Sequence, residues 1–169
     1  MILIVAGPSG SGKTTAGALL AGRLHWSFAD ADSFHPASNI EKMRAGHPLT
    51  DADRWPWLDA IGRWMDERIA AGESAVVTCS ALRRAYREAL LDGRPEARLV
   101  FLLTDRETLA THLAGRHGHF FPRGLLDSQL ADQEPPHGEK NVFVVTPEGQ
   151  PEQTVAKIIA ELRPGETPG

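Results

Sequence analysis

The sequence predicts an α/β fold of three layers, in which helices flank a central five-stranded parallel sheet. Short apolar segments rich in β-branched residues alternate with longer segments of helical periodicity, and this alternation is typical of βαβ units. A glycine-rich stretch directly after the first apolar segment suits a turn from a strand into a helix. The strands are predicted at residues 2–6, 27–31, 75–79, 99–103 and 141–145. The helices are predicted at residues 14–24, 38–45, 53–71, 83–91, 106–116, 125–133 and 151–162.

The first strand leads into a loop that is predicted to bind phosphate. An apolar run over residues 2–6 is followed by a stretch that fits the pattern G-x-x-x-x-G-K-[ST] at every fixed position. Glycines let successive N–H groups point at phosphate oxygens, while Lys13 adds a positive charge and Thr14 a hydroxyl for Mg²⁺. The flanking strand and helix argue against a Gly- and Ser-rich turn that contains Lys-Thr by chance. The residues predicted to bind the nucleotide are Gly7, Pro8, Ser9, Gly10, Ser11, Gly12, Lys13, Thr14 and Thr15.

Two aspartates lie at the end of the second predicted strand, residues 27–31. On an extended backbone Asp30 and Asp32 project to the same side, at the sheet edge that also carries the phosphate loop. Asp32 is the better candidate to accept a proton from an attacking hydroxyl. Asp30 is expected to support Mg²⁺ together with Thr14. The alternative is that one of the two carboxylates only caps or turns the chain.

The helix predicted at residues 53–71 shows the clearest periodicity. Pro56 stands near its start and Gly72 follows its end, which are typical helix boundaries. Its apolar residues recur at three- and four-residue spacing, and we interpret them as core rather than as a ligand site. They are Trp57, Leu58, Ile61, Met65 and Ile69. The next strand, residues 75–79, runs into Ser80 instead of an aspartate, so Ser80 is expected to contact the water shell of the metal or the substrate.

The alternation of strands and helices is interrupted before the last strand. Residues 116–137 contain Gly, His, Phe and Pro, and we expect a helical lid there that closes on substrate and excludes water. The tail at residues 163–169 holds two prolines and two glycines and is expected to fray. The length suits one domain, which is predicted to span residues 1–169.

Composition limits the partners and the compartment. The net charge of −4 argues against nucleic acid as a partner, and no segment reaches the apolar length of a membrane span. No basic region precedes the apolar start, so no signal peptide is expected and the protein is predicted to be cytoplasmic. Basic residues gather at Arg83, Arg84 and Arg87 and again at residues 116–123. This favours a small polyanionic ligand over a merely solvated helix face.

Several blocks outside the loop are more distinctive than the loop itself. They are Asp32-Ser33-Phe34-His35-Pro36 and residues 39–43 (NIEKM), 46–58 (GHPLTDADRWPWL), 79–87 (CSALRRAYR) and 125–129 (LLDSQ). Together they resemble the small P-loop gluconokinases, which are relatives of shikimate and adenylate kinases, over nearly the whole domain. The chain departs from the family pattern at Ala31 in place of Gly and at Arg83 in place of Lys. Neither change removes a proposed reacting group.

The resemblance implies a P-loop kinase fold and ATP- and Mg²⁺-dependent phosphorylation of D-gluconate on its terminal hydroxyl, which gives 6-phospho-D-gluconate. It also suggests a homodimer. A sugar acid needs cations, carboxylates and amides around it, and the residues expected to bind it are Asp32, His35, Arg54, Ser80, Arg83, Arg87, His119 and Gln129. The residues expected to act in catalysis are Lys13, Asp32 and Arg116. Arg116, at the start of the lid, is expected to offset charge on the transferring phosphate.

Two other functions are open at this point. A shikimate kinase or a nucleoside monophosphate kinase would share the loop and the layout, but neither explains the His35-Pro36 pair or the block around Arg54. A nucleotide-binding switch would recruit a protein partner and would more often carry a long exposed loop. The aspartate pair and the compact lid favour the small-molecule kinase.

Overall fold

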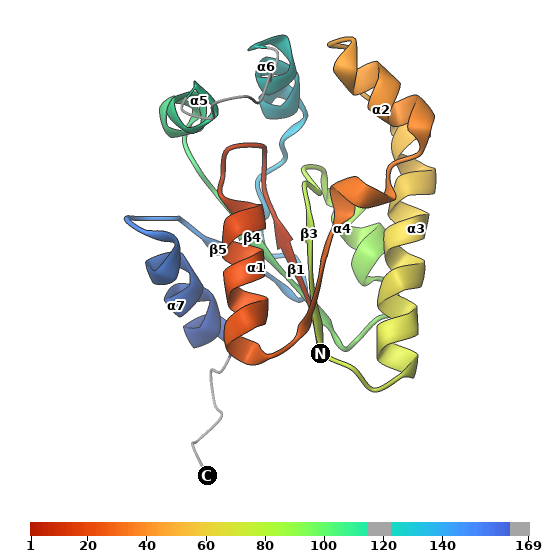
Figure 1. The fold of residues 1–169 in the computed structure, drawn as a ribbon, viewed down its shortest axis with the longest axis vertical. Coiled ribbons are helices and arrows are strands. Elements are labelled where there is room, and N and C mark those ends of the chain that lie inside the picture. Colours follow the sequence, from red (N-terminus) through yellow and green to blue (C-terminus); the bar gives the residue numbers. More distant parts are fainter. Residues whose placement is uncertain (115–122, 163–169) are drawn as a thin grey trace.

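A parallel sheet forms the centre of the molecule. In the computed structural model, which describes residues 1–114 and 123–162, the strands pair in the order β2-β3-β1-β4-β5. Their bounds are Ile2–Ala6 (β1), Ser27–Asp30 (β2), Ala75–Cys79 (β3), Ala97–Leu102 (β4) and Val142–Val145 (β5). Every neighbouring pair is parallel, so the carboxyl ends of the strands meet at one edge (Figure 1). The predicted α/β class with a five-stranded parallel sheet is confirmed.

Helices cover both faces of this sheet. Their bounds are Lys13–Leu24 (α1), Ala37–Arg44 (α2), Asp51–Ala70 (α3), Arg84–Leu91 (α4), Arg106–Ala114 (α5), Arg123–Asp132 (α6) and Pro151–Leu162 (α7), with a short 3-10 helix, η1, at Ala31–Phe34. Helices α1 and α7 lie on one face and α3 and α4 on the other, while α2, α5 and α6 lie beyond the carboxyl edge (Figure 1). The elements beyond that edge surround the place where a ligand of a parallel α/β sheet is expected.

Strand β1 supplies side chains to the cores on both faces of the sheet. Ile2 and Ile4 pack in the core shared with α3 and α4, whereas Leu3 and Val5 pack in the core shared with α1 and α7. All four are fully buried, as expected for a strand covered on both faces. Because β1 is also the middle strand, the loop that follows it lies at the centre of the carboxyl edge.

Helix α3 begins earlier than predicted because its first turn carries a capping box. The hydroxyl of Thr50 accepts the N–H of Asp53 at 3.2 Å, and the carboxylate of Asp53 accepts the N–H of Thr50 at 2.8 Å. Lys42 of α2 also binds this carboxylate, at 2.8 Å. These hydrogen bonds, that of Lys42 foremost, lower the pKa of Asp53 to about 2. The apolar stripe of α3 is buried from Trp57 to Met65, as predicted.

The second strand ends earlier than predicted, at Asp30. A carboxylate oxygen of Asp30 accepts the N–H of Asp32 at 3.0 Å, and its carbonyl accepts the hydroxyl of Ser33 at 2.7 Å. These bonds turn the chain at once into η1, so Ala31 belongs to the 3-10 helix rather than to the strand. The change redirects Asp32, because alternation along a strand no longer sets the direction of its side chain.

Two segments of the sequence analysis lie partly or wholly outside the described residues. The predicted lid, residues 116–137, is described from residue 123 onward, and the tail at 163–169 lies outside the description. Within residues 1–114 and 123–162, no helix has both the length and the apolar character needed to cross a membrane.

Candidate active site

The glycines of the phosphate loop adopt backbone conformations that side chains disfavour. Gly7, Gly10 and Gly12 have φ angles of 145°, 88° and 85°. A Cβ atom on Gly7 would lie 2.8 Å from Oγ of Ser11 and 3.0 Å from the carbonyl oxygen of Leu102, so the curl of the loop requires glycine there. Helix α1 begins at Lys13, directly after the loop, and its N-terminus adds backbone N–H donors. The loop therefore forms a cradle that fits the phosphates of a nucleotide.

The two oxygen groups expected to hold Mg²⁺ lie together. The hydroxyl of Thr14 donates to one carboxylate oxygen of Asp30 at 3.4 Å, while the other oxygen accepts the N–H of Asp32. Asp30 therefore turns the chain, as the alternative interpretation predicted, and its carboxylate also contacts the hydroxyl of Thr14. A carboxylate and a hydroxyl are the oxygen ligands that Mg²⁺ takes beside phosphates. The residues present therefore fit this metal.

A cavity of about 460 Å³ adjoins the phosphate loop. Seven residues predicted for nucleotide, substrate or catalysis line it: Ser9, Lys13, Asp32, His35, Arg54, Ser80 and Gln129. Its wall also contains apolar side chains, including those of Ile40, Met43, Trp57 and Leu82. A volume of this size with a few converging polar groups is typical of a small-molecule site. The cavity brings the lysine of the phosphate loop and the candidate base into one space.

His35 lies flat against the indole of Trp57. The ring centroids are 4.3 Å apart and the planes differ by 8°. Trp57 is held in turn by a hydrogen bond of 2.7 Å from its Nε1–H to the carbonyl of Ala31. Burial lowers the pKa of His35, Arg54 lowers it further, and Asp32 opposes the change. The structure therefore presents His35 to the cavity as a neutral ring of fixed orientation.

Helix α3 contributes the cation Arg54 to the wall of the cavity. Its side chain is only 14% exposed and donates to the hydroxyl of Tyr86 at 3.1 Å and to the carboxylate of Asp132 at 3.4 Å. Burial and a hydrogen bond to Asp51 raise the pKa of Tyr86. Tyr86 and Asp132 were not predicted as site residues, although Tyr86 lies within the block at residues 79–87. No local pattern marks Asp132, because its partners are distant in the sequence.

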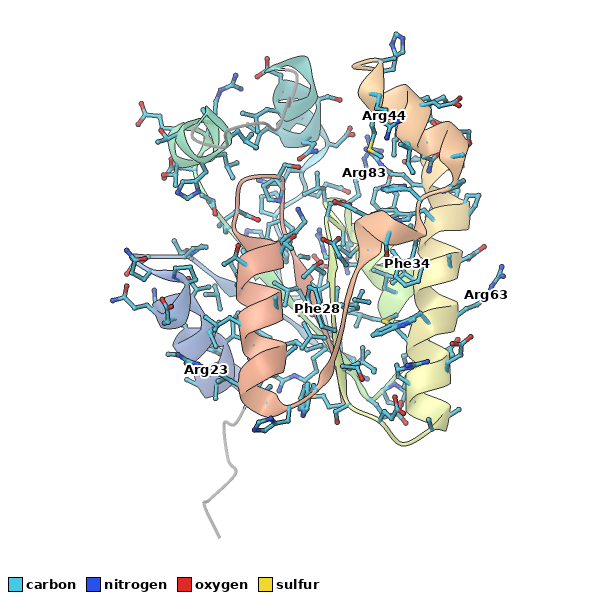
Figure 2. All side chains as sticks on the ribbon, in the orientation of Figure 1. Arg23, Phe28, Phe34, Arg44, Arg63 and Arg83 are labelled. Atoms are coloured by element: carbon cyan, nitrogen blue, oxygen red, sulfur yellow. The ribbon has the colours of Figure 1, made fainter. Side chains whose placement is uncertain are left out.

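The other two predicted substrate arginines lie outside the cavity lining. Arg83 donates to Asp132 at 2.7 Å and lies 3.7 Å from Asp51; Figure 2 shows it at the carboxyl edge, whereas Arg63 projects outward from α3. Arg87 is 1% exposed and forms two hydrogen bonds of 2.9 Å to Glu139. Its remaining donors bind backbone carbonyls. This placement gives Arg87 a structural role in place of the predicted contact with substrate.

Helix α6 contacts the phosphate loop through Gln129. The N–H of Ser9 donates to Oε1 of Gln129 at 2.9 Å, and Nε2 of Gln129 donates to the hydroxyl of Ser9 at 3.2 Å. On the other side of the loop, Nδ1 of His112 in α5 lies 2.7 Å from the carbonyl oxygen of Gly10. The helices beyond the carboxyl edge are therefore joined to the loop by side chains. Arg116 and His119 lie outside the described residues.

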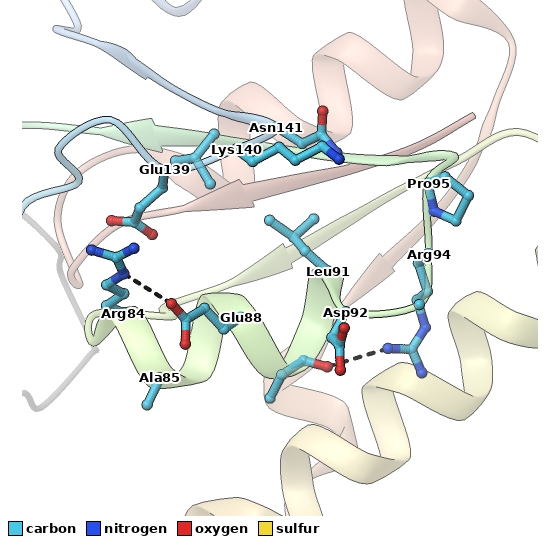
Figure 3. Close-up of a pocket in the computed structure, with 13 residues that line it drawn as sticks. Arg84, Ala85, Glu88, Leu91, Asp92, Arg94, Pro95, Glu139, Lys140 and Asn141 are labelled. Carbon is cyan, nitrogen blue, oxygen red and sulfur yellow. Dashed lines mark hydrogen bonds and ion pairs between the residues drawn. The ribbon is translucent and has the colours of Figure 1, made fainter.

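A second and larger cavity, of about 810 Å³, is lined by the outer side of α4 and the turns at residues 92–95 and 139–142 (Figure 3). Arg84 lies here, bound to Glu88 at 2.9 Å. None of the residues predicted to bind substrate or nucleotide lines it. Volume alone would therefore select the wrong cavity, because the larger space lacks the phosphate loop and the candidate base.

Comparisons with known proteins agree with this geometry. A family model described as an AAA domain matches residues 2–136. A gluconokinase of Gluconobacter oxydans is 46% identical over 161 residues, which cover 95% of this chain and 90% of that protein. Among solved structures, a sugar kinase from a Janibacter species has a TM-score of 0.89 at 42% identity and covers 95% of this chain and 93% of its own. A gluconokinase from Sinorhizobium meliloti 1021 has a TM-score of 0.81 at 40% identity and covers 95% and 94%.

Proposed function

This chain belongs to the gluconokinase family, and from that premise we propose that it transfers the γ-phosphoryl group of ATP to the terminal hydroxyl of D-gluconate. The products are ADP and 6-phospho-D-gluconate. The observation that carries the proposal is the shared cavity, because Lys13 of the phosphate loop and Asp32, His35 and Arg54 of the acceptor side line the same space. A kinase needs its donor phosphate and its acceptor hydroxyl in such proximity.

Asp32 is the proposed base. As the terminal hydroxyl attacks the γ-phosphorus, a new P–O bond forms, the bond to the bridging oxygen of ADP breaks, and the hydroxyl proton passes to the carboxylate of Asp32. Lys13 and the N–H groups of the loop offset the charge on the phosphate oxygens. Thr14 and Asp30 would hold Mg²⁺, which when bound neutralises further charge on these oxygens. Arg116 is proposed to add a positive charge from the lid.

The acceptor side supplies groups of the kind that a sugar acid needs. Arg54 is proposed to bind the carboxylate of gluconate, and its contacts with Tyr86 and Asp132 hold the guanidinium in place. His35, Ser80 and Gln129 line the same cavity and offer hydrogen bonds to the row of hydroxyls. Arg83 and His119 remain proposals as well, with Arg83 acting through Asp132 rather than from the cavity wall.

The proposal is tested by a coupled assay of ADP release with different acceptors. We expect fast turnover with gluconate and ATP, and only background rates with shikimate, with nucleoside monophosphates or without an acceptor. Turnover without gluconate that matches the rate with gluconate would contradict the proposal. Slow, acceptor-independent hydrolysis alone would indicate a nucleotide switch.

Three further proposals concern the whole protein, of which the homodimer rests on the family resemblance and the other two on the sequence. We propose that it acts as a homodimer in the cytoplasm, with a lid over residues 116–137 that closes on bound substrate. Sedimentation equilibrium measures the assembly state directly, and a mass equal to that of a single chain across the micromolar range would contradict the dimer.

A further inference from the structure

Asn39 lies in the interior of the acceptor side and contacts the ring of His35. The residue is 2% exposed, so water does not compete for its hydrogen bonds. The amide nitrogen, Nδ2, lies 2.9 Å from the carbonyl oxygen of Asp53 and 3.2 Å from Nδ1 of His35. Asn39 of α2 therefore links the backbone in the first turn of α3 to the imidazole of His35 in the cavity wall.

These contacts determine where the proton of His35 lies. A backbone carbonyl only accepts hydrogen bonds, so the amide group that faces Asp53 is the NH₂ group and not the oxygen. The second hydrogen of that NH₂ group is directed at Nδ1 of His35, which must then accept it with a lone pair. A neutral imidazole whose Nδ1 accepts carries its proton on Nε2.

The charges around the ring agree with this assignment. The groups that face His35 are Asp32 of η1 and Arg54 of α3, and His47 lines the same cavity. Burial outweighs the attraction of Asp32 and keeps the pKa of His35 below its usual value. A proton on Nδ1 would in addition point at the NH₂ group of Asn39, which repels it. Trp57 holds the plane of the ring by stacking, so both the orientation and the tautomer are set by protein contacts.

We propose that Asn39 is a positioning residue that keeps His35 in the Nε2–H form, so that His35 offers the acceptor substrate a hydrogen-bond donor and not a lone pair. The identity of that substrate as gluconate rests on the function proposed above. The tautomer does not, because it follows from contacts within the protein. An Nε2–H donor suits a ligand rich in hydroxyl and carboxylate oxygens.

The tautomer is measured without any substrate. Long-range ¹H–¹⁵N spectra of the ¹⁵N-labelled protein distinguish Nε2–H from Nδ1–H, and the signals of His35 are identified by their loss in His35→Gln. We expect the Nε2–H form at neutral pH in the wild type. In Asn39→Asp the carboxylate accepts from Nδ1–H, so the pKa of His35 should rise and the Nδ1–H or doubly protonated form should appear.

A double-mutant cycle tests the effect on substrate binding. At a pH at which His35 of the variant is neutral, Asn39→Asp should raise the KM for gluconate about tenfold, as expected for one lost hydrogen bond, with a smaller change in kcat and an unchanged KM for ATP. His35→Gln keeps an N–H donor near the position of Nε2 but has no tautomer to set, so adding Asn39→Asp to it should change KM less than about threefold. Asn141→Asp makes the same charge change at an exposed residue outside this cavity and should leave both constants unchanged.

The outcomes separate this proposal from the proposed function. A wild-type His35 with its proton on Nδ1 overturns the proposal even if Asn39→Asp does not fold. Equal increases of KM in the two backgrounds also overturn it, because they would indicate a purely structural role. If the wild type fails to phosphorylate gluconate while the spectra show Nε2–H, the substrate assignment is wrong and the tautomer assignment stands.

Discussion

The two aspartates that follow β2 have different surroundings and therefore different chemistry. Both carboxylate oxygens of Asp30 are engaged, one by Thr14 and one by the N–H of Asp32. The side chain of Asp32 instead lines the acceptor cavity together with Lys13. Asp30 is thus suited to hold a metal ion in a fixed place, and Asp32 is suited to receive a proton.

Asp32→Asn should lower kcat with gluconate about 10²- to 10⁴-fold, because the amide does not accept the hydroxyl proton. ATP binding should remain nearly intact, and equilibrium titration with a nucleotide analogue measures it separately from turnover. Asp59→Asn, an exposed change on α3, is the matched control. Wild-type turnover in Asp32→Asn would remove Asp32 from the role of base.

For Arg87 we expect the opposite of the effect at Asp32, namely a loss of stability without a specific loss of activity. Arg87→Met leaves Glu139, which is only 6% exposed, without its partner, and breaking a buried pair in this way costs about 3–5 kcal/mol of unfolding free energy. Arg84→Met, which breaks the exposed pair with Glu88, should cost less than about 1 kcal/mol. Denaturant unfolding measures both. If Arg87→Met folds normally but no longer binds gluconate, the structural assignment is wrong.

Residue roles could be predicted where the motif is local, and not where a partner is distant in the sequence. The residues of the phosphate loop and the pair Asp30 and Asp32 follow one another closely, so their proximity follows from the spacing. Arg83 and Arg87 form one cluster in the sequence, yet their partners, Asp132 and Glu139, come about fifty residues later. The sequence pattern around α4 does not predict whether Arg83 or Arg87 is buried, because burial depends on packing against the later segment that holds Asp132 and Glu139.

At the scale of elements, helix α1 packs against the sheet through a glycine. A Cβ atom on Gly17 would lie 2.5 Å from Cγ2 of Thr78 and 3.3 Å from Cε2 of Phe28, whereas one on Gly22 would meet nothing within 4 Å. Gly17 thus sets how closely α1, and the phosphate loop before it, approach β3. Gly22 has no such constraint.

Alanine at these two positions should have opposite effects on stability. Gly17→Ala should lower the free energy of unfolding by about 1–3 kcal/mol, because overpacking displaces the helix. Gly22→Ala on the same helix should raise it by up to about 1 kcal/mol, since alanine favours helix. Thermal or denaturant unfolding of both variants checks the pair, and equal changes of the same sign would contradict the packing argument.

Which segments form helices and which form strands could be predicted from the sequence, whereas the residues at which they begin and end depend on side-chain caps. Apolar periodicity identified α3, but the capping box between Thr50 and Asp53 moved its start to Asp51. The hydrogen bond from the N–H of Asp32 to Asp30 ended β2 before Ala31. Each cap consists of one or two hydrogen bonds that can override the apolar pattern nearby. Apolar periodicity therefore does not locate the ends of the elements.

At the scale of the molecule, α6 connects the phosphate loop to the acceptor side. Gln129 binds Ser9 of the loop, and Asp132, at the end of the same helix, binds Arg54 and Arg83. The helix is thereby joined to both parts of the proposed active site. Its position should depend on these few polar contacts.

Gln129→Ala removes both hydrogen bonds to Ser9 and should release α6 from the loop. With about 1 kcal/mol for each bond, we expect amide hydrogen exchange in residues 123–132 to become about tenfold faster or more. The amides of β1 serve as the internal control and should exchange at the wild-type rate. Unchanged protection of α6 would mean that other contacts hold the helix.

The cavity wall has a consequence for how acceptor choice evolves. Asp32, His35, Arg54 and Trp57 come from one continuous stretch between the end of β2 and the first turns of α3, whereas the donor loop follows β1 and is encoded separately. Substitutions in that stretch would alter most of the acceptor contacts and leave the phosphate loop and the central strand unchanged, while Ser80 and Gln129 add acceptor contacts from other segments. The chain thus encodes most of its acceptor contacts and its phosphate loop in separate segments.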